Sequence, residues 1–460
     1  MKPVWTFDQV VDQLTNWGGR WNNSIPVPFM FYAQSLTHHQ FKFGFLPFND
    51  AERQSLLRTM QLVSDVANIS FVNIGSFPTN PSVSNPFMGF YTINQSSAAF
   101  WGAATGYVTE GAGPPEPMGR IYGVDIVVNH HRANVQGGWE IGDSNSRKLM
   151  HELLHGVGLD HAGDYNGDSA LSYETHASFH QDSNQYTVMS YWTANNTGAN
   201  HSAGGVLQFA STPLLYDVAA LQALYGANMS TRTGDTVYGF NNTSGRDAFD
   251  LQRDPSAVFT IWDAGGVDTL DLSGYSSASR IDLREGAFSD AGGMTSNISI
   301  AYGALIENAI GGSGNDRLTG NEARNRLTGG GGDDSVEGAD GADWLIGSGG
   351  GDIFAYTGLA DSMVPVSRSD GHKSGSDYVA DFLSGTDKID LSALDANNTT
   401  AADDAFSFIG NGAFSGKAGE LRFEVSDSWT AIFGDVNGDG VADFRIAVSS
   451  LTVTVNDFIL

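Results

Sequence analysis

The two halves of this chain carry different patterns of apolar and polar residues. Up to about Met229, apolar residues recur in several segments at the period of an amphipathic helix. This spacing predicts helices over Phe7–Trp17, Asp50–Ala67, Asn145–Val157 and Thr212–Leu224. Short runs of β-branched and aromatic residues predict strands over Pro28–Ala33, Ser70–Ile74, Phe87–Ile93 and Ile121–Val128. We therefore expect an α+β domain in residues 1–235.

Residues 236–460 are predicted to form an all-β domain, because the helical spacing stops near Val237 and Gly, Asp, Asn and Ser increase. The most regular part is a nine-residue repeat, GGxGxDxUx, in which U is a large apolar residue. The five copies are Gly311–Thr319, Gly320–Thr328, Gly329–Glu337, Gly338–Ile346 and Gly347–Ala355. The large apolar residues are Leu318, Leu327, Val336, Leu345 and Phe354. We expect two repeats to make one coil of a parallel β-roll within a β-roll and β-sandwich domain.

Each repeat is expected to form a glycine-dependent turn followed by a short strand. Carbonyl oxygens of the turn and the sixth-position carboxylate are the hard ligands that Ca²⁺ prefers. Alternate repeats place their turns on the same edge of the roll, with Asp316, Asp334 and Asp352 on one edge and Asn325 and Asp343 on the other. A plain Gly/Asp-rich linker is the alternative, which five copies in register disfavour.

The second repeat departs from the pattern. Its turn contains Asn321–Ala323 in place of small residues, and Asn325 replaces the aspartate. We expect the ion on that edge to bind more weakly than the ions beside Asp316 and Asp334.

Turns of similar composition flank the five repeats. The segment Asp263–Asp271 matches the second half of the repeat. Further along the chain, Asp381, Asp387 and Asp390 are expected to lie close together. These turns extend the predicted calcium-binding region on both sides of the repeats.

The segment HELLHGVGLDH, which begins at His151, has the spacing of a catalytic zinc site. His151 and His155 share one face of a helix, so both can bind one ion. Glu152 is placed to act on water bound to that ion, and Gly158 allows a left-handed turn that returns His161 as third ligand. Three protein ligands leave one position open for water, which is the catalytic pattern. An ordinary amphipathic helix is the alternative, but this combination is rarely accidental.

The composition narrows the classes of partner. The chain has 460 residues, of which 41% are hydrophobic, and a formal net charge of −29. An acidic surface repels nucleic acid and anionic membranes, and it favours the binding of divalent cations. There are no cysteines, which excludes disulfides and thiolate ligands. No run approaches the ~20 apolar residues of a membrane-spanning helix.

The residues that follow the histidine segment resemble those of the metzincin metalloproteases. The segment TVMSYW, Thr187–Trp192, resembles their methionine-containing turn, with Met189 as the methionine beneath the zinc site. Together with the repeats, the chain resembles the serralysins, a family of secreted bacterial proteases. The segments LLYDVAALQALYGAN, TRTGDTVYGF, TIWDAGGVDTLDLSGY and IENAIGGSGNDRL are similar to that family, and the resemblance covers nearly the whole chain. One departure is Ala162, where serralysins usually carry proline.

The resemblance implies a metzincin-type α+β protease domain followed by a calcium-binding β-roll. It implies that His151, His155 and His161 bind one catalytic zinc ion and that Glu152 is the catalytic base. It also implies that Tyr191 binds near or to zinc and moves to stabilise the transition state. The expected function is that of a secreted zinc-dependent endopeptidase, which hydrolyses peptide bonds of extracellular proteins with a zinc-activated water.

Several structural calcium ions per chain are expected from the repeats, the flanking turns and the resemblance. The expected ligands are Arg253, Asp263, Gly265, Gly266, Asp268, Gly311, Ser313, Asp316, Gly329, Gly331, Asp333, Asp334, Gly338, Asp340, Asp343, Gly347, Gly349, Asp352, Asp381, Asp387 and Asp390. The turns carry like charges that repel until an ion joins them. We therefore expect the roll to be disordered in the low-calcium cytosol and to fold outside the cell.

The expected route of export follows from the two ends of the sequence. Met1–Leu14 lacks the apolar core of an N-terminal signal peptide. Asp457–Leu460, DFIL, resembles the C-terminal signal read by ABC-type one-step exporters. The resemblance further implies a monomer, with protein substrates and a small periplasmic proteinaceous inhibitor as partners. Substrates are expected to lie along an edge strand near Gly106–Thr109.

Two alternatives from other classes stay open. The first is a calcium-folded secreted binding or adhesin module with an inactive protease half, against which the intact Glu152 and Tyr191 argue. The second is a zinc hydrolase that acts on small amides or esters. Peptide cleavage without a preference for esters would exclude the second alternative.

Overall fold

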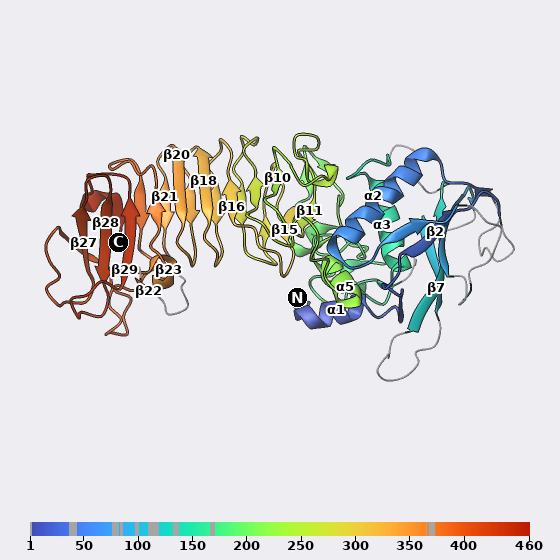
Figure 1. Ribbon diagram of the computed structural model, residues 1–460, viewed down its shortest axis with the longest axis horizontal. Helices are drawn as coiled ribbons and strands as arrows, with labels where there is room; N and C mark the ends of the chain where they lie inside the picture. Colours follow the sequence, from blue (N-terminus) through green and yellow to red (C-terminus); the bar gives the residue numbers. More distant parts are fainter. Residues whose placement is uncertain are drawn as a thin grey trace.

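The computed structural model describes residues 2–35, 44–75, 82, 86–96, 101–108, 119–131, 138–165, 171–364, 366–367 and 373–460. The molecule is elongated, with helices and a mixed sheet at one end and a long stack of short strands at the other (Figure 1). In the described residues every α-helix ends by Tyr225. The confinement of helical spacing to the first half of the chain is thus confirmed.

The predicted helices begin close to the predicted positions. They are α1 (Phe7–Leu14), α2 (Asp50–Val66), α3 (Ser144–Gly156) and α5 (Leu215–Tyr225), and a short helix that was not predicted is α4 (Tyr173–His176). Capping boxes at Thr6 and Asn49 satisfy the first amide groups of α1 and α2. Helix α1 ends before the predicted Trp17, because the chain turns there toward the first strand. Helix α5 begins later than the predicted Thr212, because the Asp217 carboxylate accepts from the Leu214 amide and caps the helix there.

The N-terminal sheet is mostly parallel. Its strands are β1 (Gly19–Arg20), β2 (Val27–Phe31), β3 (Phe45–Leu46), β4 (Phe71–Asn73), β5 (Phe87–Ile93), β6 (Gly102–Val108) and β7 (Gly119–Asn129). Strands β4, β2, β5 and β7 are parallel in that order, and β6 pairs antiparallel with β7. Helix α3 packs on β6 and β7, and α2 packs on α3. Strand β6 therefore forms an edge of the described sheet next to the motif helix.

Two stacked sheets build the C-terminal half. One contains β10 (Val237–Gly239), β12 (Thr269–Asp271), β16 (Asn308–Ile310), β18 (Arg326–Gly331), β20 (Trp344–Gly349), β24 (Tyr378–Val379), β29 (Phe444–Val448), β28 (Thr430–Asp435), β27 (Glu420–Val425) and β26 (Ser407–Gly410) in spatial order. The other contains β13 (Arg280–Asp282), β17 (Arg317–Thr319), β19 (Ser335–Glu337), β21 (Ile353–Ala355), β25 (Lys388–Asp390) and β30 (Phe458–Ile459). Successive repeats alternate between the two sheets, as a β-roll requires.

The register confirms two repeats per coil. Arg317 pairs with Ser335 and Arg326 pairs with Trp344, in parallel and 18 residues apart. The five apolar residues at position eight, Leu318, Leu327, Val336, Leu345 and Phe354, are all 0% exposed. They stack between the two sheets and form the narrow core of the roll.

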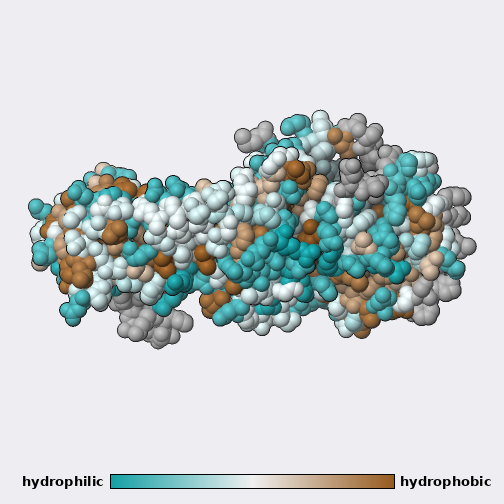
Figure 2. Space-filling view, turned by 90° about the horizontal axis from the view of Figure 1, so that it is seen from above, coloured by the Kyte–Doolittle hydropathy of each residue, from teal (hydrophilic) through white to brown (hydrophobic). Residues whose placement is uncertain are grey.

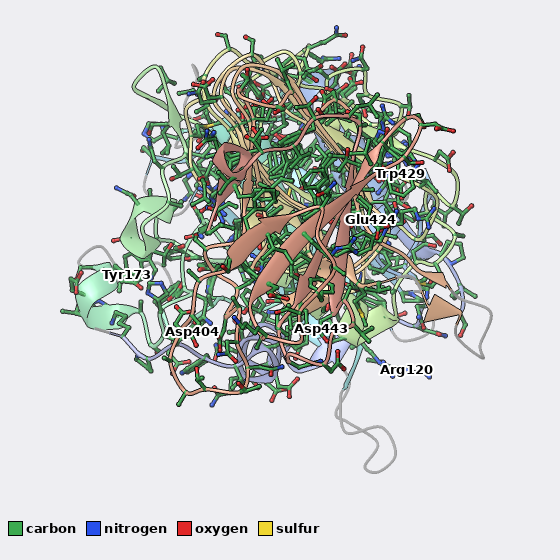
Figure 3. All side chains as sticks on the ribbon, turned by 90° about the vertical axis from the view of Figure 1, so that its left-hand side faces the viewer. Arg120, Tyr173, Asp404, Glu424, Trp429 and Asp443 are labelled. Carbon is green, nitrogen blue, oxygen red and sulfur yellow. The ribbon has the colours of Figure 1, made fainter. Side chains whose placement is uncertain are left out.

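Smaller elements complete the fold. They are the three-stranded sheet β11 (Phe259–Ile261), β15 (Ile298–Ile300) and β14 (Phe288–Ser289), the hairpins β8 (Ser202–Ala203) with β9 (Val206–Leu207) and β22 (Val366–Ser367) with β23 (Lys373–Ser374), and the 3₁₀ helices η1 (Ala194–Thr197), η2 (Asp247–Phe249), η3 (Leu359–Ser362) and η4 (Val455–Asp457). At the far end of the roll, the antiparallel strands β27–β29 lie in front in Figure 3, with Glu424 and Trp429 on the β27–β28 hairpin.

The surface of the molecule carries both apolar and hydrophilic residues. On the face shown in Figure 2, apolar residues form small separate patches among hydrophilic ones. Among the described residues, no helix has both the length and the apolar character to cross a membrane.

Candidate active site

Helix α3 and the turn after it bring the three motif histidines together. His151, Glu152 and His155 lie on α3 and are at most 9% exposed. The predicted left-handed turn is present, because Gly158 has a φ of +100°. A Cβ at that position would lie 2.5 Å from the carbonyl oxygen of Gly19, so close packing also requires glycine. The turn returns His161 to the other two histidines.

The three Nε2 atoms converge on one point. The Nε2 of His161 lies 3.0 Å from that of His155 and 3.2 Å from that of His151. Zn–N distances of about 2.0–2.1 Å would place the nitrogens of a tetrahedral site about 3.3 Å apart. In the described part of the chain, only these three residues bring three ligand side chains within 4.8 Å of one another. The cluster therefore fits a zinc ion.

Hydrogen bonds orient two of the rings toward this point. Nδ1 of His151 donates to the Val188 carbonyl and Nδ1 of His155 donates to the Leu159 carbonyl, each at 2.8 Å. A carbonyl can only accept, so each Nε2 keeps its lone pair for a metal. Burial lowers the pKa of His151 and His155, and it lowers the pKa of His161 to about 3. All three imidazoles are thus neutral at pH 7, the form that binds metal.

Glu152 lies beside the histidines without belonging to their cluster. Burial raises the pKa of this carboxyl to about 8, against the opposing charge of Arg147. The start of β6 leaves room for the side chain, since a Cβ on Gly102 would lie 2.7 Å from Glu152 Oε1. The carboxyl group is therefore desolvated and held between α3 and the edge strand.

The methionine-containing turn is tied to helix α5. Met189 is 0% exposed and belongs to the main core. Asp217 on α5 accepts hydrogen bonds from Thr187 Oγ1 (2.5 Å) and from the Val188 amide (2.9 Å). Because Val188 in turn holds His151, Asp217 supports a histidine through the turn. Burial raises the pKa of Asp217 to about 6.

Tyr191 lies at the rim of the histidine cluster. Its side chain is 40% exposed, and its ring centroid lies 4.7 Å from that of His161 and 6.0 Å from that of His151. The neighbouring loop is braced by Asp182, which accepts from Tyr165 Oη (2.7 Å) and Trp192 Nε1 (3.1 Å). The sequence motif therefore brings Tyr191 to the site, at a position that substrate can reach.

Along one edge of the roll, the predicted aspartates form a ladder. The Asp316 amide donates to Asp334 Oδ1 (2.7 Å), and the Asp334 amide donates to Asp352 Oδ1 (2.9 Å). The ladder continues to Asp387, which accepts from the Asp352 amide at 3.0 Å. Asp334 Oδ2 is buried without a hydrogen-bond partner. Burial and the charges of neighbouring aspartates raise the pKa of Asp334 to about 7. This unpaired, crowded acceptor fits a cation.

The opposite edge carries a second ladder. The backbone amide of Asn325 donates to Asp343 Oδ1, and the backbone amide of Asp343 donates to Asp377 Oδ1, both at 2.8 Å. The Oδ2 atoms of Asp343 and Asp377 are buried without hydrogen-bond partners. Burial and like charge raise the pKa of both carboxyl groups. Asp377 was not predicted and completes this edge.

The second repeat, which departs from the consensus, has side-chain amides that donate hydrogen bonds to carbonyl oxygens. Asn321 Nδ2 donates to the carbonyls of Leu283 (3.1 Å) and Ile306 (2.9 Å). Asn325 Nδ2 donates to the carbonyl of Glu307 (2.8 Å). These carbonyls already have hydrogen-bond donors, which is consistent with the prediction of weaker ion binding here.

The first glycine of each remaining repeat packs on the carboxylate of that repeat. A Cβ there would lie 2.1–2.5 Å from the carboxylate oxygen in the pairs Gly311 with Asp316, Gly329 with Asp334, Gly338 with Asp343 and Gly347 with Asp352. Of the other predicted ligands, Ser313 lies in the same turn as Gly311, whereas Gly331 and Gly349 end β18 and β20. Asp333 accepts from the Gly351 amide, and Asp340 is exposed. The turns thus have the tight geometry that the repeat predicts.

The flanking turns differ in their geometry. In the first, Gly265 and Gly266 have φ values of +139° and +147°, Asp263 accepts from Tyr238 Oη at 2.6 Å, and Asp268 Oδ2 is buried without a hydrogen-bond partner. The side chain of Arg253 pairs with Asp247 at 2.5 Å.

The second flanking turn does not gather its three aspartates. Asp381 accepts from the Gly347 and Ser348 amides, and Asp387 joins the first ladder. Asp390 does not join them, because it ends β25 at the opposite end from Asp387 and its Oδ1 accepts from Ser392. The expected proximity of Asp390 to Asp381 and Asp387 is corrected accordingly.

Comparisons with known proteins agree with this geometry. Residues 227–460 match the family model described as Peptidase M10 serralysin C terminal. Metalloprotease AprA of Pseudomonas entomophila is 40% identical over 457 residues, covering 97% of this chain and 88% of the relative. Serralysin A of Dickeya chrysanthemi is 36% identical over 468 residues, covering 100% of this chain and 91% of the relative. The chain belongs to the serralysin family.

As a serralysin, the chain is a metalloendopeptidase, and the names of its relatives favour this function over an inactive adhesin module. Among solved structures, the AlgE6R2 subunit of the Azotobacter vinelandii mannuronan C5-epimerase aligns with 45% of this chain and 96% of its own, at 23% identity. Its TM-score of 0.22 is too low to compare the folds.

Proposed function

We propose that this serralysin cleaves peptide bonds with one zinc ion bound by His151, His155 and His161 and with Glu152 as general base. The convergence of three buried, neutral Nε2 atoms beside a buried carboxyl group carries this proposal. Elemental analysis tests it, together with a casein cleavage assay before and after chelation. One zinc per chain and chelator-sensitive cleavage are expected, whereas absence of zinc from active protein would overturn the assignment.

Each group has a distinct role in the proposed mechanism. Zinc, when bound, would supply Lewis-acid chemistry toward water and the scissile carbonyl. Glu152 takes a proton from the attacking water and delivers it to the leaving amine, a transfer favoured by a pKa near the working pH. The Tyr191 hydroxyl donates a hydrogen bond to the oxyanion that develops on the substrate. Asp217 holds the turn that orients His151.

The substrate is proposed to lie extended along the edge strand β6. This strand pairs on one side with β7 and begins at Gly102 beside Glu152. An extended peptide can add to such an edge through backbone hydrogen bonds, with little dependence on sequence. Of the predicted segment Gly106–Thr109, Thr109 lies outside the described residues.

Replacement of Tyr191 with phenylalanine is expected to lower kcat for peptide cleavage by about 10²-fold with little change in KM. The phenyl ring preserves the contacts with His161 but lacks the hydroxyl donor. Steady-state kinetics on a fluorogenic peptide measures the effect, and zinc content provides the control. A kcat equal to that of the parent enzyme would show that Tyr191 does not stabilise the transition state.

We further propose that Ca²⁺ binds along both aspartate ladders and that the roll folds after export. The buried, unpaired Oδ2 atoms of Asp334, Asp343 and Asp377 support ion sites on both edges. Asp457, in the proposed export signal, is 0% exposed and accepts from the Gly385 amide at 2.7 Å. The folded roll would bury Asp457 and Phe458 of this signal, so an ABC-type exporter is proposed to read the chain before calcium folds it outside the cell.

Replacement of Asn325 with aspartate is expected to have opposite effects with and without calcium. In chelator, a new charge beside Asp343 adds like-charge repulsion and lowers the thermal midpoint of the roll. In 10 mM calcium, the carboxylate strengthens ion binding on that edge and raises the midpoint above that of the parent protein. Scanning calorimetry measures both. A decrease under both conditions would contradict an ion site at this repeat.

A further inference from the structure

A small pocket adjoins the three-histidine cluster and contains one arginine that forms no ion pair with any described residue. The pocket has a volume of about 80 Å³, and its lining includes Arg147, Asn184, Val188, Tyr191, His201 and Gln208. Val188 holds His151, and Tyr191 packs on His161, so the pocket shares a wall with the proposed active site. A substrate side chain next to the scissile bond can therefore enter it.

Arg147 provides the charge in this pocket. It lies on α3 one turn before His151, and the Cζ atom of its guanidinium group lies 5.8 Å from the ring centroid of Phe209. Arg147 Nε is buried without a hydrogen-bond partner, and no ion pair joins the group to another described residue, although the more distant carboxyl group of Glu152 interacts with it electrostatically. A desolvated charge without an ion-pair partner destabilises the folded protein, and binding of an anionic group would compensate it.

The other lining residues offer little competition for an anion. The Asn184 amide donates to the carbonyls of Thr187 and Ser190, and Gln208 donates to the carbonyl of Val206. Burial lowers the pKa of His201, which is therefore neutral at pH 7. No lining residue, all of which lie in described segments, is acidic. The pocket thus combines apolar and neutral polar side chains with a single cation.

We propose that Arg147 selects substrates that place a carboxylate next to the scissile bond, as the side chain of aspartate or glutamate. This specificity rests on the proposed peptidase function. Guanidinium binds carboxylate through two parallel hydrogen bonds, and a desolvated pocket strengthens this pairing. A neutral amide leaves the arginine charge uncompensated, and a lysine or arginine side chain is repelled. The free C-terminal carboxylate of a peptide substrate has the same chemistry, so the test must distinguish it from an acidic side chain.

The test begins with the zinc- and calcium-loaded full chain and a mixture of peptides from a digested proteome. Mass spectrometry of the products is expected to show enrichment of aspartate and glutamate at one position flanking the cut. A matched peptide pair with glutamate or glutamine at that position is then expected to differ about 10- to 100-fold in kcat/KM. Each peptide is prepared with a free and an amidated C-terminus, and an effect of amidation would assign the anion to the chain end instead.

Arg147→Gln is expected to bring the glutamate-to-glutamine ratio close to one, whereas Arg147→Lys keeps part of it. Lys148→Gln is the matched control, since it removes a positive charge from the same helix but not from the pocket, and it should preserve the ratio. If Arg147→Gln does not fold, rising ionic strength on the parent enzyme should lower the ratio. No acidic enrichment, or an unchanged ratio in folded Arg147→Gln, overturns the proposal while leaving the peptidase function intact. Failure of the loaded parent enzyme to cleave any peptide would instead refute the proposed function.

Discussion

Replacement of Glu152 with glutamine is expected to lower kcat/KM for peptide cleavage by about 10²- to 10⁴-fold, the usual contribution of a general acid–base group. Glutamine has nearly the same shape but cannot accept the proton of the attacking water. The site is buried, with Glu152 only 7% exposed, so bulk solvent is a poor substitute for this base. The measurement is steady-state kinetics on a fluorogenic peptide, with casein as a protein substrate.

Two controls separate loss of the base from loss of the site. Zinc content should be unchanged in Glu152→Gln, because the three converging nitrogens belong to other residues. Glu174→Gln, on the exposed face of α4, removes a carboxylate elsewhere and should keep full activity. Cleavage by zinc-loaded Glu152→Gln within about threefold of the parent rate would rule out Glu152 as the base.

The sequence predicted those features whose partners are close in sequence or recur at a fixed period. The nine-residue period leads directly to the 18-residue register of Asp316 with Asp334, because each coil repeats the same step. The left-handed conformation of Gly158 follows from the short distance between His155 and His161 along the chain. These relations need no knowledge of tertiary packing.

Asp217, Arg147 and Asp377 were missed for identifiable reasons. Asp217 acts on Thr187, 30 residues away, through a contact that only tertiary folding creates. Arg147 could have been found, since it lies four residues before His151 and therefore on the same helix face. Asp377 follows Asp343 by 34 residues instead of 18, because an insertion that contains η3 hides the continued repeat. Once the insertion is removed, Asp377 and Val379 occupy the sixth and eighth positions.

Removal of calcium is expected to unfold the roll while the N-terminal sheet persists. If each ion binds with the 10⁻⁴–10⁻³ M dissociation constant of extracellular sites, 10 mM calcium contributes about 1.4–2.7 kcal/mol per ion. Several ions together approach the ~5–15 kcal/mol that stabilises a typical domain. Hydrogen exchange should therefore show that chelation exposes the amides of strands β17–β21 but not those of β5 and β7. Equal protection of β17–β21 with and without calcium would contradict the proposed sites.

The pH dependence of the stability of the calcium-free roll provides a second test of the proposed calcium sites, with a direction that can be predicted. In the ion-free fold, burial raises the pKa of Asp334 to about 7 and that of Asp352 to about 6, from an ordinary value of 3.8. The folded roll then binds more protons than the unfolded chain, so its stability falls as pH rises from about 4 to 7. Chelated protein should therefore keep more folded roll at pH 5 than at pH 8. Asp334→Asn should weaken this dependence, whereas Asp427→Asn, on an exposed hairpin, should not. A chelated roll that is more stable at pH 8 would show that these carboxylates do not repel one another in the absence of an ion.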